Sequence, residues 1–321
     1  MTISAKIIAD SISTSTRITT YELEYPRFIH AEFLTHRLFS RNAASSRAIP
    51  VKKQIELVKE NPAMPIHWGM NQPGMSADEE CNEYVATPFP WTDDNGREIW
   101  LVDGLRREEA WLAGRDRAVE VAEAFANAGY HKQIVNRILE PYAHIKVVLT
   151  STEFDNFWWL RHHRDAQPEI HELARHMLIA LAASTPVYLK PGDWHLPYYN
   201  DGYWRMSNHD RVERELEEAI AVSASCCAQV SYRRLDDSIE KALNIHKRLV
   251  ESKPVHASPF EHQATPIADD PASLKWPTGT THVDHEGEWW SANFRGWIQN
   301  RQLMDDHTCW NYEAASETSG S

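Results

Sequence analysis

Several features that mark common protein classes are missing from this 321-residue sequence. No apolar run approaches the roughly 18 residues that a membrane-spanning helix requires, and the first residues lack the basic start and apolar stretch of a signal peptide. The four cysteines form no CxxC pair, and a chain of this length needs no disulfides to stabilise its core. We therefore expect a cytoplasmic protein with reduced thiols and no membrane partner.

The usual nucleotide-binding and hydrolase motifs are also missing. There is no GxGxxG between a strand and a helix, no Walker loop and no GxSxG. The formal net charge is -13, and the sequence has no long Lys/Arg stripe that would release counterions from nucleic acid. We therefore expect no nucleic-acid partner, although a local basic pocket is still possible.

The hydrophobic pattern predicts a mixture of strands and helices without regular alternation, which is typical of an α+β fold. We expect one catalytic domain over residues 1–312, with an irregular insertion at about 61–100 and a disordered tail at 313–321. Strands are predicted at 3–9, 18–25 and 145–149, and a loop at 42–47. Helices are predicted near 103–127, 131–139, 153–163, 167–183, 210–228 and 236–251.

Three segments carry candidate functional residues. In the first, residues 36–47, three arginines and several small polar side chains suit the binding of a phosphate, because a guanidinium supplies a fork of donors. A solvated basic turn is the alternative. In the second, Arg161 and Asp165 would share a helix face beside Trp158 and Trp159, which could hold a planar heterocycle. An ordinary amphipathic helix with an Arg161–Asp165 pair is the alternative.

The third segment is His256-Ala257-Ser258-Pro259-Phe260-Glu261-His262. Its two histidines and glutamate suggest a metal, but their spacing fits no usual zinc pattern, so we expect no metal. Catalysis through a cysteine thiolate would need an activated thiol, and the sequence neighbours of the four cysteines give no obvious activation.

Together these segments resemble the flavin-dependent thymidylate synthases. That family has the signature Arg-His-Arg-x-x-Ser-x-Asn-Glu-x-Ser-x-Arg-Tyr, and residues 35–48 match it at six positions: His36, Arg37, Ser40, Asn42, Ser45 and Arg47. Residues 156–170 resemble the family's Asn-Phe-x-x-Leu-Arg…Ala-Gln-x-Glu-Ile helix, and residues 137–141 resemble its Arg-x-x-Leu-Pro element.

The order of the segments differs from the family's usual order. An Ala-Arg-Val-Ser strand and a His-x-Thr-Pro-Phe-Glu-His turn usually precede the signature, whereas the similar residues 228–231 and 256–262 follow it here. The chain therefore resembles a divergent, circularly rearranged member. Thr35, Ala43 and Ala48 depart from the signature, and the first two replace an arginine and a glutamate. Arg41 or Arg164 is a candidate for supplying the charge that Thr35 lacks.

The resemblance implies a thymidylate synthase-like α+β fold, a mixed sheet with several long helices, and a homotetramer with active sites between subunits. It also implies FAD as cofactor, NADPH as reductant, 5,10-methylene-tetrahydrofolate as carbon donor and dUMP as substrate. Carried over by position, Arg161 and His256 are catalytic. The implied nucleotide-binding residues are Glu32, Arg37, Ser45, Ser46, Arg47, Arg137 and Arg161. The implied FAD-binding residues are His36, Arg37, Ser40, Asn42, Asn156, Asp165, Ser231, Ser258 and Glu261.

Other interpretations stay open at the level of sequence. A C5 methylase or hydroxymethylase of another pyrimidine nucleotide, such as UMP, would share this fold and flavin. A non-catalytic nucleotide-binding relative would keep the scaffold without the colour of a flavoprotein. A zinc hydrolase built on the many histidines is a third possibility, which metal analysis would test.

Overall fold

The computed structural model describes residues 3–14, 16–88, 90–92, 95–99, 104–206, 212–230, 239–268 and 275–311. Its centre is a five-stranded mixed sheet with the order β3-β6-β2-β1-β7. Three strands are long: β1 (Ser4–Ile12), β2 (Arg17–Pro26) and β6 (His144–Ser151). Two short strands form its edges: β3 (Ser40–Ala43) is antiparallel to β6, and β7 (Val187–Tyr188) is parallel to β1.

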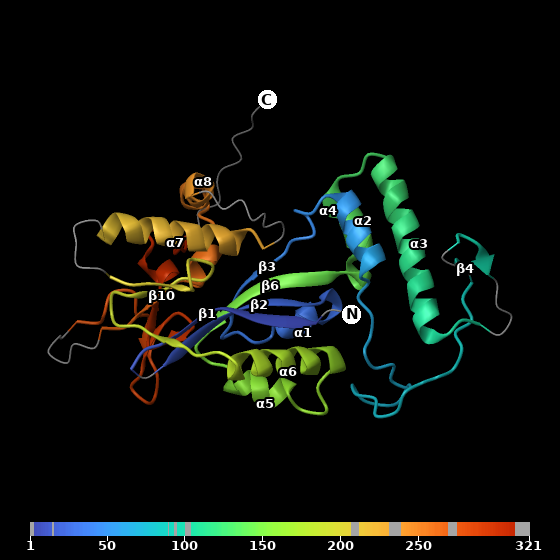
Figure 1. Ribbon diagram of the computed structural model, residues 1–321, viewed down its shortest axis with the longest axis horizontal. Helices are drawn as coiled ribbons and strands as arrows, with labels where there is room; N and C mark the ends of the chain where they lie inside the picture. The colour runs from blue at the N-terminus through green and yellow to red at the C-terminus, as the bar shows by residue number, and fades with distance from the viewer. Residues whose placement is uncertain are drawn as a thin grey trace.

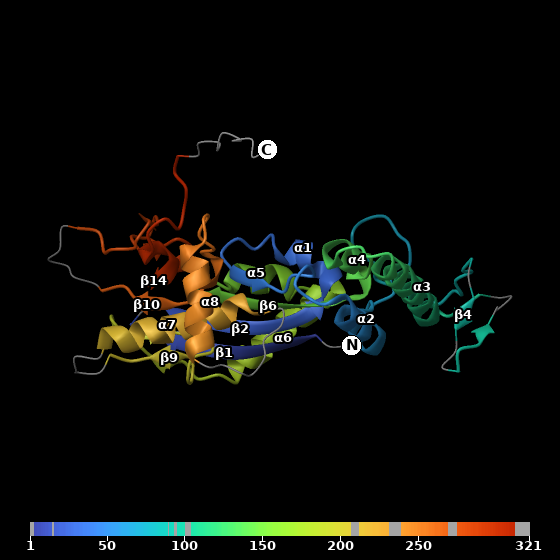
Figure 2. The same cartoon turned by 90° about the horizontal axis from the view of Figure 1, so that it is seen from above.

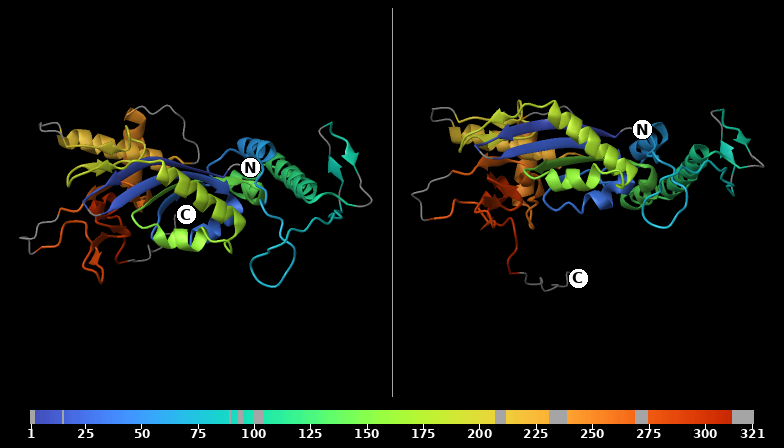
Figure 3. Two further views of the ribbon diagram at one scale, coloured as in Figure 1. Left: turned by 60° about the horizontal axis from the view of Figure 1, so that its bottom comes forward. Right: turned by 90° about the horizontal axis from the view of Figure 1, so that it is seen from below.

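Alternation of side chains along β2 and β6 gives the sheet two different faces. One face, which we call the closed face, carries the fully buried Tyr21, Leu23 and Tyr25 of β2 and the apolar residues Ile145, Val147 and Leu149 of β6. The helices α5 (Asp155–Arg161) and α6 (Pro168–Ala182) cover this face (Figures 1 and 3). Burial of these large side chains is the main stabilising contribution to the fold.

Among the described residues, helices cover the opposite face of the sheet at its two ends (Figures 1 and 2). The helices α7 (Val212–Ala228) and α8 (Ile239–Glu251) lie over one end. A second group lies at the other end and has its own small core of Val58, Val119, Ala122, Val135 and Leu139. Its helices are α2 (Val51–Glu60), α3 (Arg107–Asn127) and α4 (Lys132–Ile138).

Short elements complete the described structure. The four-stranded sheet β14-β10-β8-β9 and the three-stranded sheet β11-β12-β13 lie at the end near α7. Their strands are β8 (Trp194–His195), β9 (Tyr203–Trp204), β10 (Ala264–Pro266), β11 (His282–Val283), β12 (Trp289–Ser291), β13 (Phe294–Arg295) and β14 (Trp297–Gln299). The remaining elements are η1 (Arg27–Ile29), α1 (His30–Phe33), β4 (Trp91–Thr92), β5 (Glu98–Ile99), η2 (Glu140–Tyr142), η3 (Ser258–Glu261) and η4 (Asn300–Leu303).

The α+β class, the strands at 3–9, 18–25 and 145–149, and most of the predicted helices are confirmed. The loop predicted at 42–47 is partly wrong, because residues 40–43 pair with β6 as the edge strand β3. The long helix begins at Arg107, where the Glu109 side chain accepts a hydrogen bond from the Arg106 N–H, while Asp103 lies outside the described residues. Ala228 ends helix α7, so no strand begins there.

Three further predictions fall outside the described residues: Ser231, the first turn of the 236–251 helix, and the disordered tail at 313–321. No helix among the described residues is both long and apolar enough to cross a membrane. The extent of the catalytic domain stays a prediction.

Candidate functional site

The candidate residues follow the edge strand β3. One group precedes the strand, around Glu32 and His36, a second lies on it, and a third lies in the loop of residues 44–50 that leads to α2. Because β3 borders β6 on one side only, its other side is open to contacts from elements that are distant in the sequence.

Arg161 is the centre of the first group. It is the last residue of α5, and its Nε donates a hydrogen bond of 2.8 Å to Nε2 of His36. Its Nη1 pairs with the Glu32 carboxylate, and its Nη2 donates to Thr35 Oγ1 at 3.5 Å. A guanidinium has five N–H donors. Three of them are used in this way, so two remain for a ligand.

His36 is held as a neutral hydrogen-bond acceptor. Burial, and to a smaller extent the nearby charges of Arg161 and Arg41, lower the pKa of His36 to about 4. Since Nε2 accepts from Arg161, the proton of the neutral ring is on Nδ1. The pair therefore fixes the orientation of both side chains.

A small cavity of about 140 Å³ adjoins this group. It is lined by Thr35, His36, Arg37, Asn156 and Phe157, together with four neighbouring residues. Arg37 and Asn156 are both exposed, and no hydrogen bond or ion pair of Arg37 is found among the described residues. The two side chains are thus available to a ligand.

The second group joins β3 to the segment that follows it late in the sequence. The amide of Asn42 lies beside the Ser258 carbonyl oxygen at 3.1 Å and beside His262 Nε2 at 3.3 Å. The buried Ser40 hydroxyl lies 3.3 Å from Oδ1 of Asn293 and accepts from Nε2 of Gln299 at 3.2 Å. The turn of residues 256–262 and the signature are therefore neighbours in space, despite their order in the chain.

The C-terminal segment contributes residues that sequence reasoning missed. Arg301 forms an ion pair with Glu261, and Arg295 forms one with Glu153 at 2.7 Å. Asn293 donates from Nδ2 to the Leu38 carbonyl at 3.0 Å. None of the quoted motifs includes these residues, and only the high polarity of 291–301 could have drawn attention to them.

The third group is the loop that carries Ser45, Ser46 and Arg47. Ser46 donates to Glu140 Oε1 at 2.7 Å, and Asn136 donates from Nδ2 to the Ser46 carbonyl at 2.7 Å. These contacts fix the loop against α4, which carries Arg137. Arg47 and Arg137 are both exposed, and neither has a hydrogen bond or ion pair among the described residues. Ser45 is half-buried beside them.

One expectation about the remaining candidates needs correction. Helix α5 ends at Arg161, so Asp165 lies beyond it and shares no helix face with Arg161. Asp165 pairs instead with Arg164 at 3.3 Å and with His163 at 3.5 Å. Arg41 donates from Nη1 to the Phe33 and His36 carbonyls, and its role in supplying the charge that Thr35 lacks, like that of Arg164, stays a prediction.

His256 is exposed, at the start of the turn that ends in His262. No group of three His, Cys, Asp or Glu side chains suited to a metal ion occurs within the part of the chain that the structure describes.

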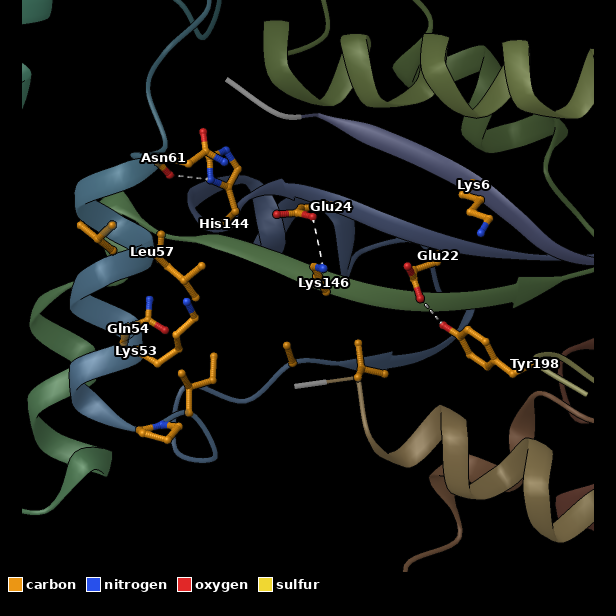
Figure 4. Close-up of a pocket in the computed structure, with 16 residues that line it drawn as sticks. Lys6, Glu22, Glu24, Lys53, Gln54, Leu57, Asn61, His144, Lys146 and Tyr198 are labelled. Carbon is orange, nitrogen blue, oxygen red and sulfur yellow. Dashed lines mark hydrogen bonds and ion pairs between the residues drawn. The ribbon is translucent and has the colours of Figure 1, made fainter. Parts of the chain in front are cut away.

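A larger cavity, of about 660 Å³, lies on the opposite face of the sheet (Figure 4). Its floor is formed by charged side chains of the strands, Lys6, Glu22, Glu24 and Lys146. One wall is formed by Lys53, Gln54 and Leu57 of α2. It contains none of the predicted site residues, but Ala44 and Ile49, which flank the Ser45–Arg47 loop, line its edge. The loop of residues 44–50 thus lies between strand β3 and this cavity.

Comparison with known protein families finds a match to one family. The profile of the family described as thymidylate synthase complementing protein matches residues 15–187, more than half of the chain. No curated protein matches the sequence.

Solved structures show more distant similarity. The UMP/dUMP methylase PolB from Streptomyces cacaoi, bound with 5-Br dUMP, has 17% identity and a TM-score of 0.37, covering 57% of this chain and 90% of that chain. The same protein bound with 5-Br UMP has 18% identity and a TM-score of 0.37, covering 57% and 89%. The flavin-dependent thymidylate synthase ThyX from Helicobacter pylori, complexed with FAD and dUMP, has 15% identity and a TM-score of 0.32, covering 51% and 67%.

Proposed function

Since this chain belongs to the thymidylate synthase complementing protein family, we propose that it uses FAD to methylate C5 of a uracil nucleotide. The proposed reaction converts dUMP to dTMP, with 5,10-methylene-tetrahydrofolate as carbon donor and NADPH as reductant. The runner-up substrate is another pyrimidine nucleotide, such as UMP. We further propose that the enzyme is a homotetramer.

The arrangement around Arg161 is the observation that carries the proposal. Glu32, His36 and Thr35 hold the guanidinium and leave two of its N–H donors unused. Such a group can bind a carbonyl of the uracil ring and stabilise negative charge that develops on the ring when C5 reacts. Glu32 keeps the guanidinium in place, and neutral His36 does so without adding a competing positive charge.

Phosphate recognition is assigned to the loop after β3. Arg47 and Arg137 lie on the two segments that the Asn136–Ser46 hydrogen bond joins, and both are without a partner among the described residues. Exposed arginines of this kind suit a phosphate, since a guanidinium donates two parallel hydrogen bonds to its oxygens. Ser45 would add a hydroxyl donor, while the Ser46 hydroxyl is already bonded to Glu140.

The residues along β3 suit a flavin dinucleotide. Arg37 has an unpaired guanidinium for the pyrophosphate, and Asn156 and Asn42 offer amide groups for the ring or ribityl chain. FAD would supply hydride transfer, and the protein would supply binding and orientation. This division requires no enzyme nucleophile. Ser40, Asp165, Ser231, Ser258 and Glu261 stay predicted FAD contacts, and His256 a predicted catalytic residue.

The visible spectrum of the purified protein tests the proposal. We expect a flavin spectrum that bleaches under anaerobic NADPH, with a rate that changes on addition of dUMP or UMP and so identifies the preferred nucleotide. Arg47→Ala should weaken nucleotide binding about tenfold or more, because a charge-assisted hydrogen bond contributes about 1.5–3 kcal/mol. Arg175→Ala, which removes an exposed arginine paired with Glu172, is the matched control.

Either of two results would overturn parts of this assignment. A colourless protein that takes up no added FAD would contradict the flavin enzyme and favour a nucleotide-binding relative. Unchanged nucleotide affinity in Arg47→Ala would contradict the phosphate assignment alone.

A further inference from the structure

A chain of five side-chain hydrogen bonds crosses the central sheet and ends at Asn42. Its members come from six different elements, β1, β8, β2, β6, the segment directly after η3, and β3. All except the half-buried Asn42 are buried. The contacts are Ser11 Oγ to His195 Nδ1 at 2.9 Å, His195 Nε2 to Thr20 Oγ1 at 2.8 Å, Thr20 Oγ1 to Thr150 Oγ1 at 2.7 Å, Thr150 Oγ1 to His262 Nδ1 at 2.8 Å, and His262 Nε2 to the Asn42 amide at 3.3 Å.

Both histidines of the chain are neutral. Each is fully buried, and burial lowers the pKa of His195 and the pKa of His262 to about 3. A neutral imidazole has one N–H donor and one acceptor nitrogen, and a hydroxyl has one donated proton. A hydroxyl that accepted from both neighbours would leave its own proton without an acceptor in this buried chain, so each of the four inner members, His195, Thr20, Thr150 and His262, donates once and accepts once. Only two arrangements of the protons then satisfy every bond and every proton, and they run in opposite directions.

Asn42 selects between these two arrangements. Besides His262 Nε2, its amide group faces the carbonyl oxygens of Ser258 and Arg41, each at 3.1 Å. An amide oxygen in that position would meet only lone pairs of the two carbonyls, whereas the amide nitrogen can donate to them. The nitrogen therefore lies there and shares its two protons among three acceptors. Because an amide nitrogen cannot accept, a proton on His262 Nε2 would have no partner, so Nε2 carries no proton and is an acceptor.

The remaining protons follow from this orientation. His262 carries its proton on Nδ1 and donates to Thr150, Thr150 donates to Thr20, Thr20 donates to His195 Nε2, and His195 donates from Nδ1 to Ser11. The whole chain has one direction, and it can reverse only if the Asn42 amide turns over. Hydrogen bonds in such a buried chain also polarise and strengthen one another.

We propose that this chain, together with the Ser258 and Arg41 carbonyls, holds Asn42 so that its amide oxygen, and not its nitrogen, is the group offered to the cofactor. The inner members of the chain are then positioning residues: His262, Thr150, Thr20 and His195. The part of the ligand that contacts Asn42 is an N–H or O–H donor, such as a flavin ring imide or a ribityl hydroxyl. The identity of the ligand as FAD rests on the proposed function, whereas the direction of the chain does not.

The tautomers of the two histidines test the direction in the unaltered protein. In a long-range 15N–1H spectrum of 15N-histidine-labelled protein at pH 7, both His262 and His195 should carry the proton on Nδ1. Signals are assigned from single His→Gln variants. Protons on Nε2 of both rings, or on different nitrogens in the two rings, would overturn the proposal.

Thr150→Val tests the effect on the cofactor. The variant removes the acceptor for His262 Nδ1–H, so His262 should move its proton to Nε2. There the proton opposes the N–H groups of the Asn42 amide, which should be displaced or turned over. FAD should then dissociate about five- to tenfold more readily, the equivalent of about one neutral hydrogen bond. The control is Thr19→Val, because Thr19 is also buried, on the neighbouring strand β2, but donates to Asp10 at 3.1 Å, outside the chain.

The outcomes separate this proposal from the proposed function. Equal FAD affinity in the two variants, at matched thermal stability, would overturn the positioning role. A wild-type protein that takes up no FAD would contradict the proposed function, while the tautomer spectrum would still decide the direction of the chain.

Discussion

The two faces of the central sheet are built from the same strands but serve different purposes. On the closed face, Tyr21, Leu23 and Leu149 are completely buried under α5 and α6. On the opposite face, neighbouring positions carry charged groups in the open cavity, such as Glu24 and Lys146, and hydroxyls in the buried hydrogen-bond chain, such as Thr150. Apolar burial on one face leaves the other free to carry polar groups.

The difference also shows two ways in which a sheet can hold polar side chains. Glu24 and Lys146 pair at 3.6 Å and stay in contact with solvent. Thr20 and Thr150 have no exposed surface, and each is fully hydrogen-bonded instead. Burial of polar groups is tolerated here because every donor has an acceptor.

Truncation on the closed face should have the largest effect. Leu149→Ala removes a completely buried side chain and leaves a cavity, so the free energy of unfolding should fall by about 2–5 kcal/mol. Denaturant unfolding monitored by tryptophan fluorescence measures this loss. A loss below about 1 kcal/mol would mean that the closed face is not the main source of stability.

The second largest effect on the free energy of unfolding should come from low pH, which acts on the buried histidines of the opposite face. The pKa values of His195 and His262 are lowered to about 3 in the folded protein, from 6.5 in the unfolded chain. Between these values the unfolded chain binds more protons, so stability falls as the pH drops below about 6.5. At pH 5 each histidine should cost about 2 kcal/mol relative to pH 7.

Single replacements test this origin of the acid effect. His195→Asn should lower stability at pH 7 but reduce the further loss between pH 7 and pH 5 by about 2 kcal/mol. His285→Asn, at a side chain that is 91% exposed, should leave the loss unchanged. The same pH profile in all three proteins would assign the acid effect to other groups.

The smallest effect is expected in the open cavity. Lys146→Ala removes the partner of Glu24, but the Lys146 side chain is 53% exposed, and exposed ion pairs contribute about 0–1 kcal/mol. Unfolding in the same denaturant series as Leu149→Ala gives the direct contrast on one strand. A loss comparable with that of Leu149→Ala would mean that this floor is more tightly packed than its exposure indicates.

Local sequence patterns made much of the fold predictable from sequence. The strands β1 and β2 were predicted as short strand-like segments on either side of a Ser/Thr-rich turn, and α6 from its hydrophobic pattern, which the structure shows as a buried stripe of Ile170, Leu173, Ala174 and Met177. The strand β3 could not be predicted this way. Its four residues are mostly polar, and pairing with β6, more than a hundred residues later, decides their conformation.

The same distinction applies to the site. A motif identified Arg161, but its partner was expected to be Asp165, four residues away, and is Glu32 of α1 instead. The helix ends before Asp165, and tertiary packing supplies the nearer carboxylate. No quoted motif includes Asn293, Gln299 or Arg301. Tertiary folding of the C-terminal segment brings these three residues against β3 and η3, and sequence patterns do not show such contacts.

The brevity of the two edge strands has a consequence for solubility. Long strands with open edges recruit strands from other molecules and lead to aggregation. Here β3 has four residues, with the turn at Ser258 and the side chains of Asn293 and Gln299 beside it, and β7 has only two. The long strands β2 and β6 are therefore kept in the interior of the sheet, where no foreign strand can pair with them.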